Sequence, residues 1–276
     1  MKFKSIDPKF FDGLSSSAES NDSLVEFVQF EVPMTEWTPK SVVVSDKLDP
    51  LALVISLIQG RANHFIQINK NLIDEDLFIA ANLVGGPQKY FEHGASTLVK
   101  NIKASFATEF CSPDDKDRVR MELGRFVAQV SGASVIEAAE AIFEEMYMNA
   151  IYDAPREAQR LKMLDKSYAC GDKASFKAVV GDNRLVLSCT DPFGSLDVAQ
   201  CLSRMEEVYK NGVGDSIHFR DGVGAGIGIV LMFEQAAGLY LGVIPGQCTT
   251  VCAVIPIGMS NRQRVNVKKS LHRISV

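Results

Sequence analysis

The sequence predicts an α/β protein in which residues 104–258 form a two-layer α/β sandwich, with about five strands and helices on one face. Two strand-like runs are joined by Gly181-Asp182-Asn183, which is typical of a β-hairpin turn. Two runs before Pro155 repeat apolar residues at helical spacing. A second hairpin pattern occupies residues 239–255. Helices and hairpins in this order indicate one mixed sheet packed against helices.

The same patterns divide the chain into four parts. Residues 1–23 are polar and end in a serine-rich run, so we expect a flexible arm. Residues 24–103 alternate strand-like and helix-like runs, which predicts a smaller α/β module of unknown role. Residues 104–258 form the sandwich. Residues 259–276 are basic, and we interpret them as a solvated tail or as a docking strip for an acidic protein.

Individual elements follow from periodicity and from turn residues. Ser112 and Pro113 suit the start of one helix, and Ser134 and Glu137 suit a capping box for the next. Glycine-rich residues 211–224 have the composition of a movable lid. Strands are expected at residues 24–30, 41–45, 64–68, 104–110, 174–180, 184–189, 239–245 and 249–255, and helices at 50–58, 74–84, 95–106, 113–132, 134–155, 197–210 and 227–237.

The composition is that of a globular protein, with 46% hydrophobic residues, 23% charged residues and a net charge of −5. A mildly acidic chain argues against nonspecific nucleic-acid binding as the main activity. The apolar run Leu51–Ile58 is too short to span a bilayer, and no apolar run follows Met1 as in a signal peptide. The six cysteines show no CxxC spacing, so we expect reduced thiols in a cytoplasmic protein.

The helix expected before Pro155 carries a carboxylate and a carboxamide on one face, because Glu145 and Asn149 are four residues apart. Such a pair can supply a base and an oxygen ligand for a metal ion. The alternative is a solvated polar face of a half-buried helix. Two later segments, around Asp191 and Gly228, decide between these interpretations.

Gly224, Gly226 and Gly228 alternate with other residues directly before a predicted helix. Glycines let backbone N–H groups approach a ligand, and a helix N-terminus favours anions. A dinucleotide fingerprint would need a strand leading into the glycines and an acid about 20 residues later, and neither is present. A P-loop is excluded because no GxxxxGK[ST] occurs. A helix–strand packing device remains the alternative.

The order of these features resembles the GHKL superfamily of ATP-binding domains, the histidine-kinase-like ATPases. That family has an E-x-x-x-N-A helix, an Asp box at a strand end, a lid, a G-x-G-[LI]-G-[LI] segment and a closing strand. The resemblance covers residues 104–258. The matching segments, in chain order, are Glu145–Ala150, Asp191–Gly194, Gly224–Ile229 and Cys248–Pro256.

The helix with the E-x-x-x-N-A motif is called the N-box. Within the superfamily, the segment that leads into this helix, residues 104–150, is most similar to that of the anti-sigma-factor serine kinases. Those kinases also carry a D-E-G-x-S-F-D version of the Asp box. Sensor histidine kinases share the ATP boxes, but their phospho-acceptor histidine precedes the N-box by about 100 residues in an H-E-x-x-x-P context. His93 lies closer and in Glu-His-Gly-Ala. A surface or loop histidine is the better interpretation of it.

The resemblance implies a role for each matching residue. Asn149 would coordinate Mg²⁺, and Glu145 would orient or deprotonate the attacking hydroxyl or water. Asp191 would accept a hydrogen bond from the adenine amino group, and Thr249 would support that contact. The three glycines, Gly224, Gly226 and Gly228, would hold the phosphates of ATP under the lid.

The sequence also departs from the family pattern. The Asp box usually has glycine two residues after the aspartate, where this chain has Phe193, and Gly194 would then have to provide a shifted turn. The basic residue that often follows Asn-Ala is replaced by Tyr152 and Asp153, and Cys248 stands where glycine is usual. ATP binding is therefore a firmer expectation than phosphoryl transfer.

By resemblance, we expect an ATP- and Mg²⁺-dependent signalling protein that phosphorylates or switches a regulatory protein partner, such as an anti-anti-sigma or sigma-factor-like protein. The pattern allows a homodimer and implies no direct contact with nucleic acid or membrane. The alternatives are a noncatalytic nucleotide-sensing or pseudo-kinase module, and a sensor-histidine-kinase-like ATPase core.

Overall fold

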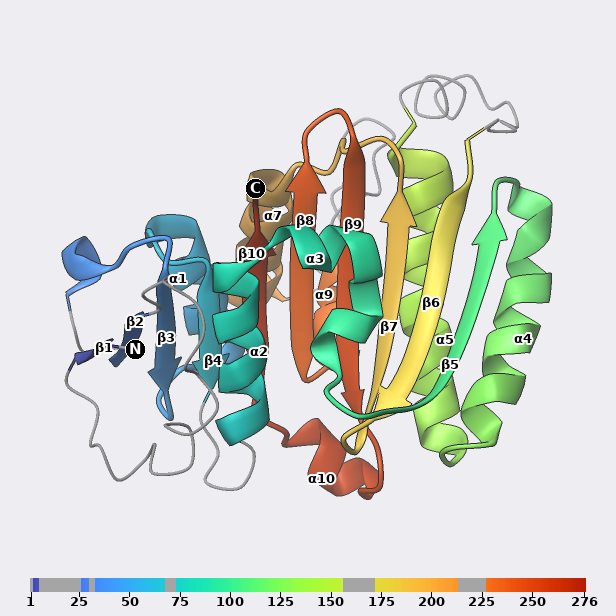
Figure 1. Cartoon of the computed structure of the whole chain (residues 1–276), viewed down its shortest axis with the longest axis horizontal. Coiled ribbons are helices and arrows are strands. Elements are labelled where there is room, and N and C mark those ends of the chain that lie inside the picture. The colour runs from blue at the N-terminus through green and yellow to red at the C-terminus, as the bar shows by residue number, and fades with distance from the viewer. Residues whose placement is uncertain (1, 5–25, 30–32, 68–72, 156–171, 213–226) are drawn as a thin grey trace.

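The computed structural model describes residues 2–4, 26–29, 33–67, 73–155, 172–212 and 227–276. These residues form a ten-stranded mixed sheet in the order β1-β2-β3-β4-β10-β8-β9-β7-β6-β5 (Figure 1). The strands, in chain order, are β1 Lys2–Lys4, β2 Glu26–Gln29, β3 Ser41–Ser45, β4 His64–Gln67, β5 Ile102–Phe110, β6 Ala174–Gly181, β7 Arg184–Asp191, β8 Gly238–Ile244, β9 Cys248–Pro256 and β10 Ser270–Ile274.

The sheet has a parallel half and an antiparallel half. Strands β1 to β4 run parallel, whereas β5, β6, β7, β9 and β8 form successive antiparallel pairs. The second set contains the five strands expected within residues 104–258. Its first hairpin turns at Asp182 and Asn183, whose φ angles are 50° and 57°. Both are left-handed, as the type I′ turn requires, so the hairpin predicted from Gly-Asp-Asn is confirmed.

Helices cover both faces of this sheet (Figure 1). One face carries the larger hydrophobic core, which includes the fully buried Leu53, Leu123, Phe143, Met205 and Phe233. The helices that contribute these side chains are α1 Pro50–Gln59, α4 Lys116–Ala128, α5 Ala133–Met148, α7 Val198–Asn211 and α9 Ile227–Gln235. The predicted α/β sandwich is thus confirmed, and within residues 104–258 the large helices share one face.

The opposite face is covered by a segment that we assigned to the N-terminal module. It comprises α2 Ile73–Gly85, α3 Gln88–His93 and the 3-10 helix η3 Gly94–Leu98. The Tyr90 hydroxyl donates hydrogen bonds to the carbonyls of Tyr240 and Thr250, at 3.0 Å each. Gly94 lies so close to β7 that a Cβ there would stand 2.8 Å from the Ser188 hydroxyl. Residues before 104 therefore complete the sandwich on its second face.

The expected helix at residues 95–106 is wrong beyond Leu98. The chain forms η3, turns at residues 99–101 and enters β5, which pairs with β6 along its length. The predicted capping box at Ser134 and Glu137 is also wrong, because α5 begins at Ala133 with Gly132 in the N-cap position. Sheet pairing decided the first case and the short turn between α4 and α5 decided the second.

The C-terminal residues are not a solvated tail. After α10 Asn261–Val265, strand β10 inserts between β4 and β8, where Leu271 and His272 are fully buried. The Lys269 ammonium donates to the carbonyls of Phe233, Glu234 and Ala236 at 2.6, 3.1 and 3.0 Å, which caps the C-terminus of α9. The basic composition did not indicate a strand, because the cationic residues here flank apolar residues that face the core.

Residues 2–4 also differ from the expectation of a flexible arm, since β1 pairs in parallel with β2. The rest of that arm lies outside the described residues. No helix in the described ranges is both long and apolar enough to cross a membrane. The five described cysteines are free thiols, and Cys189 and Cys252 are buried in the sheet.

Candidate functional site

The helix α5 ends in a turn of altered geometry at Asn149, the residue predicted to hold a metal ion. Asn149 begins the π-helical turn η5 Asn149–Asp153, and its carbonyl accepts the N–H of Ala154, five residues later, at 2.8 Å. Such turns are rare and occur often at functional sites. Glu145 lies one helical turn before Asn149, and both residues are half-buried. The pair therefore lies beside the irregular end of a buried helix.

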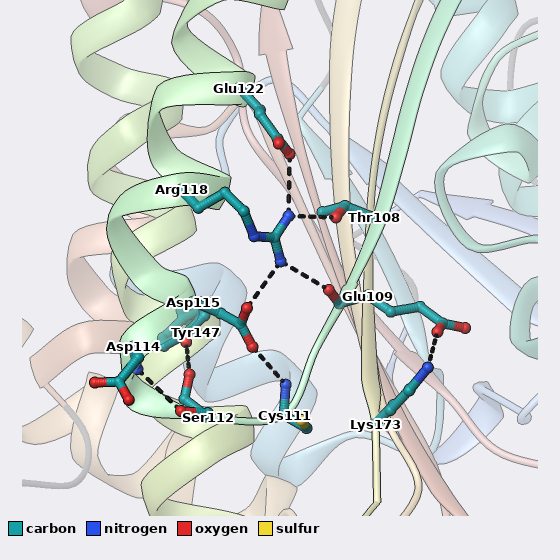
Figure 2. Close-up of polar contacts among 10 residues, drawn as sticks. All are labelled: Thr108, Glu109, Cys111, Ser112, Asp114, Asp115, Arg118, Glu122, Tyr147 and Lys173. Atoms are coloured by element: carbon teal, nitrogen blue, oxygen red, sulfur yellow. Dashed lines mark hydrogen bonds and ion pairs between the residues drawn. The ribbon is translucent and has the colours of Figure 1, made fainter.

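A polar and aromatic network fixes this end of α5 to its neighbours (Figure 2). The Tyr147 hydroxyl donates to the Ser112 carbonyl, and its ring stacks on Phe110 with centroids 4.4 Å apart. Arg118 of α4 donates to the Glu109 carbonyl at 3.2 Å, which joins α4 to the end of β5. Tyr147 lies between Glu145 and Asn149 in the sequence, so these contacts set the position of the predicted pair.

Glu145 lies directly against the glycine-led helix. A Cβ atom at Gly228, the second residue of α9, would collide with the Glu145 carboxylate, so only glycine allows this approach. Burial raises the pKa of Glu145, and the carboxylates of Glu144 and Asp153 raise it further, while Lys116 opposes the shift. A carboxyl group with a raised pKa is suited to accept and release protons near neutral pH.

Asp191 is the last residue of β7 and is only 7% exposed. Its Oδ1 accepts the N–H of Phe193 at 3.0 Å, and its strand partner across the sheet is Thr249 of β9. Burial raises the pKa of Asp191 to about 6, although main-chain N–H groups of Phe193, Gly194 and Thr249 and the nearby Thr249 hydroxyl lower it in part. The Thr249 hydroxyl is buried and makes no hydrogen bond of standard geometry within the described residues. The two side chains thus leave polar atoms available to a ligand.

The loop after Asp191 passes close to the turn between β8 and β9. Gly194 has a φ of 59°, and a Cβ there would collide with the Ile244 carbonyl. The N–H of Gly246 donates to the Gly194 carbonyl at 3.2 Å. Glycine is therefore required at residue 194, and Phe193 is half-buried in the same loop.

These elements meet at one end of the sheet, where β7 ends. Figure 1 shows the end of α5, the end of β7 and the β8–β9 turn at this same end. Helix α9 also begins there, because its other end leads into β8. Ser195 adds a direct link, since its hydroxyl donates to the Ala154 carbonyl, after η5, at 2.8 Å. Helix α5 packs on α9, β7 and β9, and η5 packs on β7.

The sequence matches no protein-family model and no curated protein. The geometry alone therefore bears on the predicted site. It places Glu145 against Gly228 and pairs Asp191 with Thr249 across the sheet. The elements that carry these residues, together with Asn149 and Gly194, lie at the same end of the sheet. Gly224, Gly226 and most of the predicted lid lie outside the described residues.

Two contacts of this site were not expected from the sequence. The hydrogen bond from the Ser195 hydroxyl to the Ala154 carbonyl depends on β7 and η5 being adjacent in the fold. Asp153 was noted as a departure from a basic residue, and its charge acts on Glu145. Neither contact could be predicted from the local sequence around Ser195 or Asp153.

The donor set fits a magnesium ion that arrives with phosphates. Mg²⁺ prefers oxygen ligands and is usually held by one or two protein groups together with substrate phosphates and water. Glu145 and Asn149 offer a carboxylate and a carboxamide oxygen one turn apart. Among the described residues, no group of three or more His, Cys, Asp or Glu side chains could hold a metal ion unaided. The oxygens present are therefore suited to a nucleotide-bound ion.

Proposed function

We propose that the protein is a cytoplasmic, ATP-binding regulatory protein, and that ATP binds between α5 and α9 at the edge formed by β7 and β9. The observation that carries this proposal is the buried Asp191 carboxyl group at the end of β7, opposite Thr249. Among the described residues, main-chain N–H groups and the nearby Thr249 hydroxyl offset its burial. The exocyclic amino group of adenine is a hydrogen-bond donor, and it would bind to the Asp191 carboxylate.

The phosphate end of the nucleotide would lie toward the start of α9. Helix N-termini favour anions, and Gly228 leaves no side chain between α9 and Glu145. In this arrangement the Asn149 side chain would supply an oxygen to Mg²⁺, and the ion would neutralise phosphate charge. Glu145 would hold the attacking hydroxyl or water, because its raised pKa makes it a stronger proton acceptor than an exposed carboxylate. The acceptor would be a serine of a regulatory protein partner.

Nucleotide binding is the direct test. We expect the wild-type protein to bind ATP in isothermal titration calorimetry, and to bind it more tightly with Mg²⁺. Asn149→Ala should remove most of the Mg²⁺ effect, since it removes the carboxamide oxygen. Asn82→Ala is the matched control, because Asn82 is exposed on α2 at the opposite face of the sheet. Absence of ATP binding by the wild type, or equal loss in both variants, would refute the proposal.

A second candidate is a noncatalytic module that uses ATP as a conformational signal. It is favoured by Asp153, whose negative charge acts on Glu145 where a phosphate-binding cation was expected. ADP release separates the two functions. Turnover by the wild type that Glu145→Gln abolishes, without loss of ATP binding, supports a kinase or ATPase. Tight ATP binding without turnover supports the noncatalytic module.

A further inference from the structure

A cavity lies on the face of the sheet covered by α2, away from the predicted nucleotide site. Its volume is about 320 Å³, and it is enclosed by α2, the β6–β7 turn, strands β3, β4, β8, β9 and β10, and the segments on both sides of α10. Figure 1 shows α2 and α10 on either side of this region. None of the residues predicted to bind nucleotide lines it. It therefore needs an explanation of its own.

The lining of this cavity includes Tyr240, whose hydroxyl group is buried. Tyr240 is fully buried, and its hydroxyl makes no hydrogen bond of standard geometry within the described part of the chain. The Ser270 hydroxyl is near enough to lower the pKa of Tyr240, while burial and Asp76 raise it. Tyr240 and Ser270 both line the cavity. A buried hydroxyl normally has a partner, so a ligand group is a reasonable candidate for this one.

The charges around the cavity do not favour an anion. Arg184 is 6% exposed, and its guanidinium donates to Asp76 at 2.9 Å and to Glu75 at 2.7 Å. Its charge is therefore already balanced by two carboxylates. Lys268 and Asp182, which also line the cavity, have opposite charges. A neutral ligand would enter without disturbing these pairs.

The remaining walls are largely apolar. They come from both halves of the chain, and they are Val44, Ile66, Leu77, Ile257, Met259 and Val267. An apolar cavity of about 150 Å³ can bind benzene, so the present volume has room for a ring and a polar substituent. Ligand pockets of this kind combine apolar walls with a few polar groups that orient the ligand.

We propose that this cavity binds a small neutral molecule with an apolar ring and one polar end, which forms a hydrogen bond with the Tyr240 hydroxyl. An amide or an alcohol meets this description, because either can donate to and accept from a phenol. The ligand would contact β3, β4 and α2 as well as β8, β9 and β10. It would thus link the two halves of the sheet. This site is independent of the proposed ATP pocket.

Three probes of similar shape test the chemistry of the site. Benzamide is neutral and polar, toluene lacks the polar end, and benzoate carries a negative charge. Binding to the full-length protein would be measured by ligand-observed NMR titration. We expect benzamide to bind about fivefold more tightly than toluene, as one hydrogen bond implies, and benzoate to bind most weakly. Equal binding of all three, tightest binding of benzoate, or no binding of benzamide would overturn the proposal.

The Tyr240→Phe variant tests the hydroxyl itself. It should lower the affinity for benzamide to that for toluene, about fivefold, without lowering the melting temperature of the free protein, because the Tyr240 hydroxyl makes no hydrogen bond of standard geometry with the described residues. Tyr209→Phe is the matched control. The Tyr209 hydroxyl donates to Glu234, so this variant should melt at a lower temperature and bind benzamide normally. A lower melting temperature for Tyr240→Phe with unchanged benzamide binding would contradict the proposal.

A cavity-filling variant provides a second, independent measurement. Met259→Trp adds an indole ring to the cavity wall on the side of α10. We expect it to abolish binding of both benzamide and toluene, with a cooperative melting transition that shows the protein to be folded. Undiminished benzamide binding to this variant would show that the probe binds elsewhere and would overturn the proposal.

Discussion

Replacing Asp191 with asparagine should make the free protein more stable while weakening its binding of ATP. Asp191 is 7% exposed, and its pKa is raised from 3.8 to about 6, mainly by burial. Asparagine has nearly the same shape and can still accept the N–H of Phe193, but it carries no charge to desolvate. Asp191 thus lowers the stability of the folded protein. Such a destabilising residue is expected at a site where function requires it.

The sign and size of the effect follow from the pKa of Asp191. Between pH 3.8 and about 6, the folded protein binds the proton of this carboxyl group more tightly than the unfolded chain does. Its contribution to the free energy of unfolding therefore falls as pH rises through this window and stays low above pH 6. At about 1.4 kcal/mol for each pKa unit, the ionised group costs up to about 3 kcal/mol at pH 7.

Urea unfolding at pH 7 and pH 4.5 measures this difference. We expect Asp191→Asn to raise the free energy of unfolding by about 1–3 kcal/mol at pH 7, and by clearly less at pH 4.5. Asp46→Asn, at an exposed residue after β3, is the control and should change it little. A variant that is less stable than the wild type at pH 7, or a difference that does not depend on pH, would refute the reasoning.

The same variant should bind ATP about tenfold more weakly, because a charged acceptor is replaced by a neutral one. Adenosine is a useful second ligand, since it has no phosphate whose titration would overlap that of Asp191. Adenosine affinity for the wild type should fall as pH drops below about 6, when the carboxylate that accepts the amino group is protonated. Asp191→Asn should show no such pH dependence.

Two further predictions concern the C-terminal strand region. Lys269→Met should lower the free energy of unfolding by about 2 kcal/mol in urea titrations, because the three carbonyls of α9 lose a charged donor, whereas Lys268→Met, at a half-buried neighbour, should cost less than 1 kcal/mol. An NMR titration should show the His64 ring neutral until pH approaches about 4, since its pKa is lowered to that value by burial and by Arg273, and a midpoint between pH 6 and 7 would contradict this.

The local sequence was sufficient for elements whose signals lie within a few residues. The turn at Asp182 and Asn183 and the Ser112 N-cap before α4 both occur as predicted, and α7 begins within one residue of its predicted start, with Asp197 as its N-cap. Each depends on side chains that bond to backbone groups two or three residues away, or on a φ angle that few residues tolerate. Such preferences act within a short segment and do not depend on the rest of the fold.

Part of the candidate site could also be predicted from the local sequence. The spacing of Glu145 and Asn149 places them one turn apart on any helix. The closeness of Glu145 to Gly228 is a different matter, because it depends on how α5 packs on α9, over 80 residues later in the chain. The residue types suggested a site, and only packing showed which of them meet.

The sequence by itself determined the α/β class, most helices and hairpins, and the residue types of the candidate site. Tertiary structure alone decided that β10 joins the two halves of the sheet, with His272 against His64 at 3.1 Å between their Nδ1 atoms. It also decided that α2 and α3 cover the second face and that Tyr240 lines a cavity. These pairings join residues up to 208 positions apart, and periodicity within one segment cannot encode which distant segment it will bury against.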